Sequence, residues 1–162
     1  MREVNLTLGR MLRIWWLYHW RIAAGGAVLA VLVLGAVGPG APPPPALAAA
    51  ALAALLLWTY FAMRMALGKC YRGFRIALLR GPSEVPAGAR QAGRIWWFYT
   101  WRNAIALLLL SLPQLAAILA AGKYTGEYSA WRALDIFWTF ALMYMVLRRK
   151  YGDLRIAMVA AD

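Results

Sequence analysis

Four long apolar stretches divide the chain, and almost no polar residue interrupts them. They cover residues 22–37, 46–63, 104–121 and 133–147. At 1.5 Å per residue an 18-residue helix is about 27 Å long, which is close to the hydrocarbon thickness of a bilayer. The shorter two reach that length if their helices continue into the flanking tryptophans. The pattern predicts four transmembrane helices, because the helices of a soluble bundle would each carry a polar face.

Two strings of residues occur twice, in the same order. R-I-W-W-L-Y-H-W-R at 13–21 recurs as R-I-W-W-F-Y-T-W-R at 94–102, an offset of 81. Residues 58–77 align with residues 138–157 at an offset of 80. Chance does not produce two such matches, so the chain is a tandem duplication. Each copy holds two apolar stretches, so we expect the copies to run parallel and to be related by an axis along the membrane normal.

The expected fold is an all-α integral membrane protein with four transmembrane helices, arranged as two tandem parallel two-helix repeats. Repeat 1 is expected at residues 1–80, a cytoplasmic linker at 81–93 and repeat 2 at 94–162. Each repeat begins with an amphipathic segment rich in tryptophan and arginine, the residues typical of the membrane interface.

A further interfacial helix is expected after each pair of spans. Tyr71 and Arg75 lie four residues apart, as do Tyr151 and Arg155. That spacing places each pair on one helical face.

Composition agrees with a lipid environment, and charge sets the orientation. The chain is 64% hydrophobic with a mean hydropathy of +0.58, too apolar for an ordinary soluble domain of 162 residues. Of the 18 basic residues, all but Lys123 and Arg132 lie before the first stretch, between the second and third, or after the fourth. The positive-inside rule therefore predicts an inner (plasma) membrane protein with its N-terminus and C-terminus in the cytoplasm. A cleavable signal peptide is the alternative for the first stretch, but the equivalent third stretch lies in mid-chain.

The arginines of the first repeated string are the candidate binding residues. One interpretation is an interfacial anchor that sets the height and tilt of each helix. The other is a pair of symmetric sites for an anionic headgroup or a cytoplasmic anionic ligand, with Arg13 and Arg21 as one clamp and Arg94 and Arg102 as the other. Nucleic acid also suits alternating basic and aromatic residues, but the membrane interface already explains these aromatics.

The second repeated string predicts packing between the repeats. Trp58 and Thr59 recur as Trp138 and Thr139 inside the second and fourth stretches. In a membrane the threonine hydroxyl can hydrogen-bond a neighbouring helix, and the indole N–H needs an acceptor.

Positions at which the two copies differ are candidates for a special task. His19 replaces Thr100, and Asp135 replaces Leu55. Asp135 follows Arg132 by three residues, which predicts an exposed ion pair near the outer boundary.

Enzyme chemistry has little support in the sequence. His19 and Cys70 are the single histidine and cysteine, too few for a bis-histidine haem, an internal disulfide or a cysteine metal cluster. No serine lies in a G-x-S-x-G context. We therefore expect no catalytic residues, no metal and no cofactor.

The sequence favours a non-enzymatic subunit, anchor or scaffold of a larger inner-membrane assembly. Its expected partners are membrane lipids, especially anionic ones, and either further copies of itself or other membrane subunits. The alternative is a channel or carrier for a small anion or lipid headgroup along the seam between the repeats.

Overall fold

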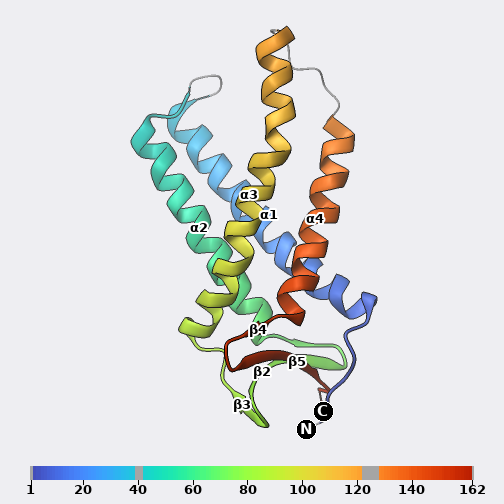
Figure 1. Cartoon of the computed structure of the whole chain (residues 1–162). Coiled ribbons are helices and arrows are strands. Elements are labelled where there is room, and N and C mark those ends of the chain that lie inside the picture. The colour runs from blue at the N-terminus through green and yellow to red at the C-terminus, as the bar shows by residue number, and fades with distance from the viewer. Residues whose placement is uncertain (1, 39–41, 122–127, 162) are drawn as a thin grey trace.

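The structure, a computed structural model, contains the same order of elements twice, namely two helices and then a β-hairpin. It describes residues 2–38, 42–121 and 128–161. At residues 113–121 and 128–132 it describes the backbone only. Figure 1 shows the helices rising from one side of a small sheet, with both chain ends at the sheet. The elements are α1 (Leu8–Val37), α2 (Pro45–Gly68), β1 (Cys70–Tyr71), β2 (Phe74–Arg80), β3 (Ser83–Val85), α3 (Ala89–Ala121), α4 (Tyr128–Arg148), β4 (Lys150–Tyr151) and β5 (Leu154–Val159).

The helices begin at recognisable local signals. The Thr7 side chain accepts a hydrogen bond from the Arg10 backbone N–H and caps α1. Pro45 is the first residue of α2, where its fixed φ suits a helix and its missing N–H costs nothing. Because α1 and α3 run without a break through the repeated W-W strings, those strings are parts of the long helices and not separate interfacial segments.

The expectation of an all-α protein is wrong, because β-hairpins follow α2 and α4. Gly73 and Gly152 have φ values of +82° and +72°, which a residue without Cβ adopts at no steric cost. They form tight turns between β1 and β2 and between β4 and β5. The four-residue spacing from Tyr71 to Arg75 therefore spans a turn, and the predicted interfacial helices do not form.

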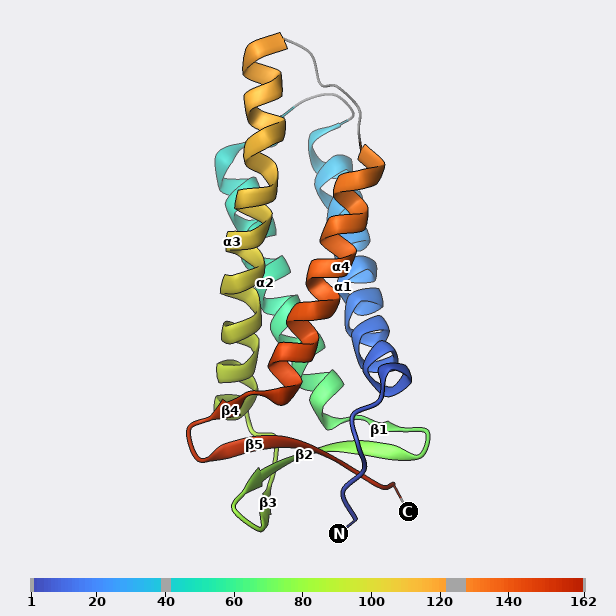
Figure 2. The ribbon, with the colours of Figure 1, turned by 45° about the vertical axis from the view of Figure 1, so that its right-hand side comes forward.

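The sheet reveals a two-fold relation between the hairpins. Its strand order is β1-β2-β5-β4, and β3 joins β2 at the side. In the antiparallel pair of β2 and β5, Ala77 lies opposite Ala157, its own equivalent in the other repeat. Ile76 and Met158, one position away, both belong to the buried cluster beneath the helices. The helices all stand on one side of the sheet (Figure 2). Because both strands turn the same face to them, we infer that the two-fold axis is perpendicular to the sheet and runs into the bundle.

The N-terminal residues and β3 occupy equivalent places beside the sheet. Glu3 forms an isolated bridge with Val159 on β5, as its equivalent Glu84 pairs with Leu79, the equivalent of Val159, on β2. The Glu3 carboxylate binds Arg155 at 2.9 Å, and the equivalent Glu84 carboxylate binds Arg75. These arginines lower the pKa of both carboxyl groups. The two E-V dipeptides lie 81 residues apart, and β3, inside the expected linker, has the place beside β2 that the N-terminal segment has beside β5.

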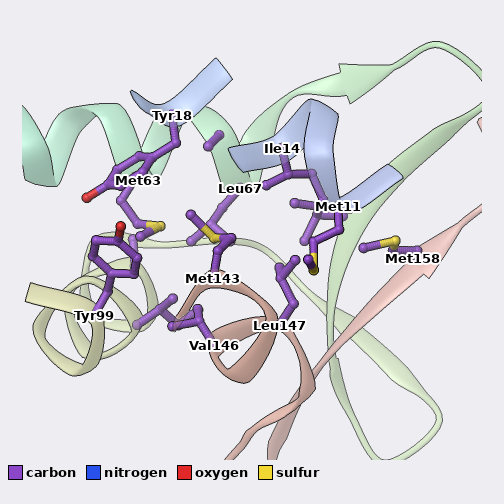
Figure 3. Packing of buried hydrophobic residues seen from close by; sticks show 14 of the residues in the cluster. Met11, Ile14, Tyr18, Met63, Leu67, Tyr99, Met143, Val146, Leu147 and Met158 are labelled. Carbon is purple, nitrogen blue, oxygen red and sulfur yellow. The ribbon is translucent and has the colours of Figure 1, made fainter. Parts of the chain in front are cut away.

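The two repeats contribute equivalent residues to one buried core at the sheet end of the bundle (Figure 3). The rings of Tyr18 and Tyr99, which are equivalent residues, meet edge to face with centroids 5.2 Å apart. The buried helix residues of repeat 1 are Met11, Ile14, Tyr18, Ala62, Met63, Ala66 and Leu67, and those of repeat 2 are Ala92, Ile95, Tyr99, Leu142, Met143, Val146 and Leu147.

Beyond this core the helices carry exposed apolar side chains. In the part of the chain whose side chains are described, α1 and α2 are long and apolar enough to cross a membrane. The protein is therefore mostly helical, with two candidate membrane-spanning helices and a small antiparallel sheet.

Candidate functional site

The repeated string of α3 lines a basic pocket at the sheet end of the bundle. Arg94 and Arg102 lie two helical turns apart, and the end of α4 with β4 adds Arg149 and Lys150. The pocket has a volume of about 400 Å³, and its walls include Trp97, Phe98 and Trp101. The sequence alone does not predict Arg149 or Lys150 as site residues. The R-R-K run at 148–150 is the sequence feature that could have indicated them.

Two guanidinium groups of the pocket share one aromatic ring. The Arg102 guanidinium lies 3.6 Å from the ring centroid of Phe98, and that of Arg149 lies 4.2 Å from the same centroid. Such stacking orients the planar cations and leaves their N–H groups free for an anion. Arg102 directs one N–H to the Phe98 carbonyl at a long 3.5 Å.

No described carboxylate forms an ion pair with these four cations. Among the described side chains the ion pairs join Arg75 to Glu84, Arg80 to Asp153 and Arg155 to Glu3, and all three lie at the sheet. Four cations without a partner acid create a positive potential that attracts an anion such as a phosphate.

Repeat 1 does not reproduce the pocket. Arg13 donates to the Arg72 carbonyl at 3.4 Å, and Arg21 lines a different hollow of about 510 Å³ with Arg64 and Lys69. One buried N–H group of Arg21 has no hydrogen-bond partner. Arg94 and Arg102 therefore line one pocket, whereas Arg13 does not line the hollow that contains Arg21.

The predicted packing residues interlock the two repeats. Trp15 of α1 donates its indole N–H to Thr139 of α4 at 3.2 Å, and the equivalent Trp96 of α3 donates to Thr59 of α2 at 2.9 Å. Each threonine therefore accepts a hydrogen bond from the other repeat.

The equivalent tryptophans of the second repeated string, Trp58 and Trp138, differ in their hydrogen bonding. Trp58 donates its indole N–H to the Arg21 carbonyl at 2.7 Å, within repeat 1. The indole N–H of Trp138 is buried and has no partner.

The residues that differ between the repeats meet in the bundle. His19 Nδ1 contacts the Trp15 carbonyl at 2.9 Å, and because a carbonyl only accepts, Nδ1 carries the proton. In the neutral ring Nε2 then accepts from the Tyr99 hydroxyl at 3.1 Å. The Asp135 carboxylate is half-buried, interacts electrostatically with His19 and Tyr99, and has one oxygen without a hydrogen bond. Asp135 is thus half-buried where an exposed ion pair was expected, and its expected partner Arg132 has its side chain outside the described residues.

Metal binding has no visible basis in the described part of the chain, since it contains no group of three or more His, Cys, Asp and Glu side chains placed to hold an ion. No protein-family model, curated protein or solved structure matches the chain significantly. The geometry of the pocket and of the bundle is therefore the guide to function.

Proposed function

We propose that the chain is a non-enzymatic integral membrane protein with four spans, acting as a subunit, anchor or scaffold of a larger inner-membrane assembly. The observation that carries this proposal is the exposure of large apolar side chains on every helix, namely Val31 on α1, Leu57 on α2, Leu108 on α3 and Phe137 on α4. A protein in water buries such a surface, whereas a lipid bilayer covers it at no cost.

The tryptophans support a membrane interface at the sheet end of the bundle. Trp16 and its equivalent Trp97 are 62% and 61% exposed, and Trp20 and Trp101 follow one turn later on the same faces. Exposed indoles at one level of a bundle are typical of the headgroup region. The sheet and both termini then lie on the cytoplasmic side, with the basic residues.

The packing of the seam favours a scaffold over a pore. The seam between the repeats is filled by Tyr18 and Tyr99, with Met63 and Met143 beside them (Figure 3). All four side chains are buried, so this level of the seam has no open path for an ion. The channel or carrier alternative would require these side chains to move.

Cysteine labelling tests the orientation. Cys70 is the native cysteine and is exposed on β1, so a failure to label it reports its side of the membrane. In intact cells we expect an impermeant maleimide to leave Cys70 unlabelled and to label Ala46→Cys, at the exposed start of α2, in a Cys70→Ser background. Permeabilised cells should label both. Labelling of Cys70 in intact cells would refute the orientation.

Purification in lipid nanodiscs tests the scaffold role. We expect the protein to elute with a fixed ratio of another membrane protein, or of further copies of itself. A scaffold whose helices are packed without an open path acts through its outer surface. The measurement is the subunit stoichiometry by mass photometry and peptide mass spectrometry. A uniform monomer without a partner would rule out the scaffold role.

A further inference from the structure

An apolar groove adjoins the basic pocket. It lies between α3 and α4, has a volume of about 540 Å³ and includes Ile105, Ala106, Leu109, Leu134, Phe137 and Trp138 in its lining. Trp101 and Arg102 line both the groove and the basic pocket. The two hollows therefore form one amphipathic site, charged at the sheet end and apolar along the helices.

In repeat 1 an indole ring fills the equivalent space. Gly25 of α1 faces Trp58 of α2 so closely that an added Cβ would lie 2.6 Å from the indole Cε2 atom. This contact lets Trp58 reach the Arg21 carbonyl, to which it donates its N–H. Because Gly25 has no side chain, the Trp58 indole fills the space between α1 and α2 at this level.

In repeat 2 a single methyl group changes this packing. Ala106 stands at the position of Gly25, and Trp138 stands at the position of Trp58. A Cβ at the equivalent Gly25 would overlap the indole, so we infer that the Ala106 methyl keeps Trp138 from packing in the same way. The Trp138 N–H is buried and has no partner, unlike that of Trp58. Ala106 and Trp138 both line the groove, which indicates that this substitution opens it.

We propose that the groove and the pocket together bind one anionic phospholipid. An acyl chain lies along the groove, and the phosphate lies among Arg94, Arg102, Arg149 and Lys150. The groove, at about 540 Å³, and the pocket, at about 400 Å³, each fall in the range of about 300–1,000 Å³ typical of small-molecule sites. The inference rests on the proposed function in one respect, because a lipid reaches this site only if the helices lie in a membrane.

The unpaired cations determine which lipid binds. A zwitterionic headgroup brings its own cation to the pocket, whereas phosphatidylglycerol brings a net negative charge. We expect the purified protein in detergent to bind phosphatidylglycerol at least tenfold more tightly than phosphatidylcholine, as measured by native mass spectrometry. Equal binding of the two lipids would overturn the proposal.

Matched substitutions test the charged half of the site. Arg149→Ala should weaken phosphatidylglycerol binding about tenfold, whereas Arg90→Ala, an equal change of charge at an exposed position outside the pocket, should leave it within twofold. Inorganic phosphate and glycerophosphate distinguish a lipid from a free anion. If either binds as tightly as phosphatidylglycerol, the site is a phosphate site and the lipid proposal is wrong.

A second pair of substitutions tests the apolar half. Ala106→Gly should allow Trp138 to approach α3 and should lower lipid binding about tenfold. Ala104→Gly removes the same methyl from an exposed position of the same helix, with the same loss of helix propensity, and should leave binding unchanged. Unchanged binding in Ala106→Gly would refute the groove as the chain site.

Alkaline extraction of membranes separates this proposal from the proposed function. If the protein resists extraction but shows no preference for phosphatidylglycerol, the lipid site is wrong and the membrane assignment stands. If the alkaline wash releases the protein, both are wrong.

Discussion

Replacing Gly25 by alanine is expected to destabilise the protein by about 2–4 kcal/mol, from steric overlap and a lost hydrogen bond together. The new methyl would overlap the Trp58 indole, whose N–H donates to the Arg21 carbonyl at 2.7 Å. Either α1 and α2 move apart or the indole leaves its place, and in both cases a buried donor loses its acceptor. The measurement is the free energy of unfolding in mixed micelles titrated with sodium dodecyl sulfate.

The neighbouring glycine is the control. A Cβ added at Gly26 has no heavy atom within 4 Å, so Gly26→Ala should gain helix propensity, by about 1 kcal/mol at most. The two adjacent substitutions are chemically identical and should change stability with opposite signs. Equal free energies of unfolding for both variants would show that Trp58 does not pack on Gly25.

Replacing Tyr99 by alanine is expected to lower the free energy of unfolding by about 3–5 kcal/mol, the usual cost of removing a buried aromatic ring. Tyr99 is 3% exposed, meets Tyr18 edge to face and binds His19 through its hydroxyl. Its removal leaves a cavity where the two repeats meet. The same titration with sodium dodecyl sulfate measures the loss.

Trp97 is the matched control for Tyr99. It lies two residues earlier on α3, in the same repeated string, but is 61% exposed. Trp97→Ala should cost less than about 1 kcal/mol in micelles, because the removed ring contacts mainly the surrounding detergent. If Trp97→Ala and Tyr99→Ala had equal effects, the string would serve as an interfacial anchor throughout.

The sequence predicts four long helices, which the structure contains, but it does not separate the two faces of the repeated string. Ile14 and Tyr18 pack in the core, whereas Trp16 and Trp20 are exposed. In a soluble protein polarity would mark the exposed face. If the helices lie in lipid, as we propose, an apolar face is expected on both sides, so periodicity alone does not assign them.

The two hairpins could have been predicted from a glycine that occurs in both copies, although the four-residue spacing around it also fits a helix. A distance of four residues from Tyr71 to Arg75 fits a helix, yet the same two residues fit two strands joined by a turn at Gly73. Glycine in both copies of this segment, Gly73 and Gly152, is the better guide, since a helix gains nothing from it.

The candidate site is only half visible in the sequence. Arg94 and Arg102 follow from the helical period of one segment. Arg149 joins them through the packing of α4 beside α3, and the groove depends on whether one position carries a methyl group. Both depend on tertiary contacts that no local pattern encodes.

Ala77 pairs with its equivalent Ala157, so the two repeats meet as two halves of a symmetric dimer would. Here, however, both halves belong to one polypeptide. A protein made of two separate identical halves would carry every side chain twice, once on each side of its symmetry axis. Joining the halves in one polypeptide keeps them at a high effective concentration and lets each half change by itself. His19, Ala106 and Asp135 each occur on one side of the axis only. The covalent link thus allows one half to keep a closed helix pair while the other opens a groove, which a symmetric dimer of one gene product cannot do.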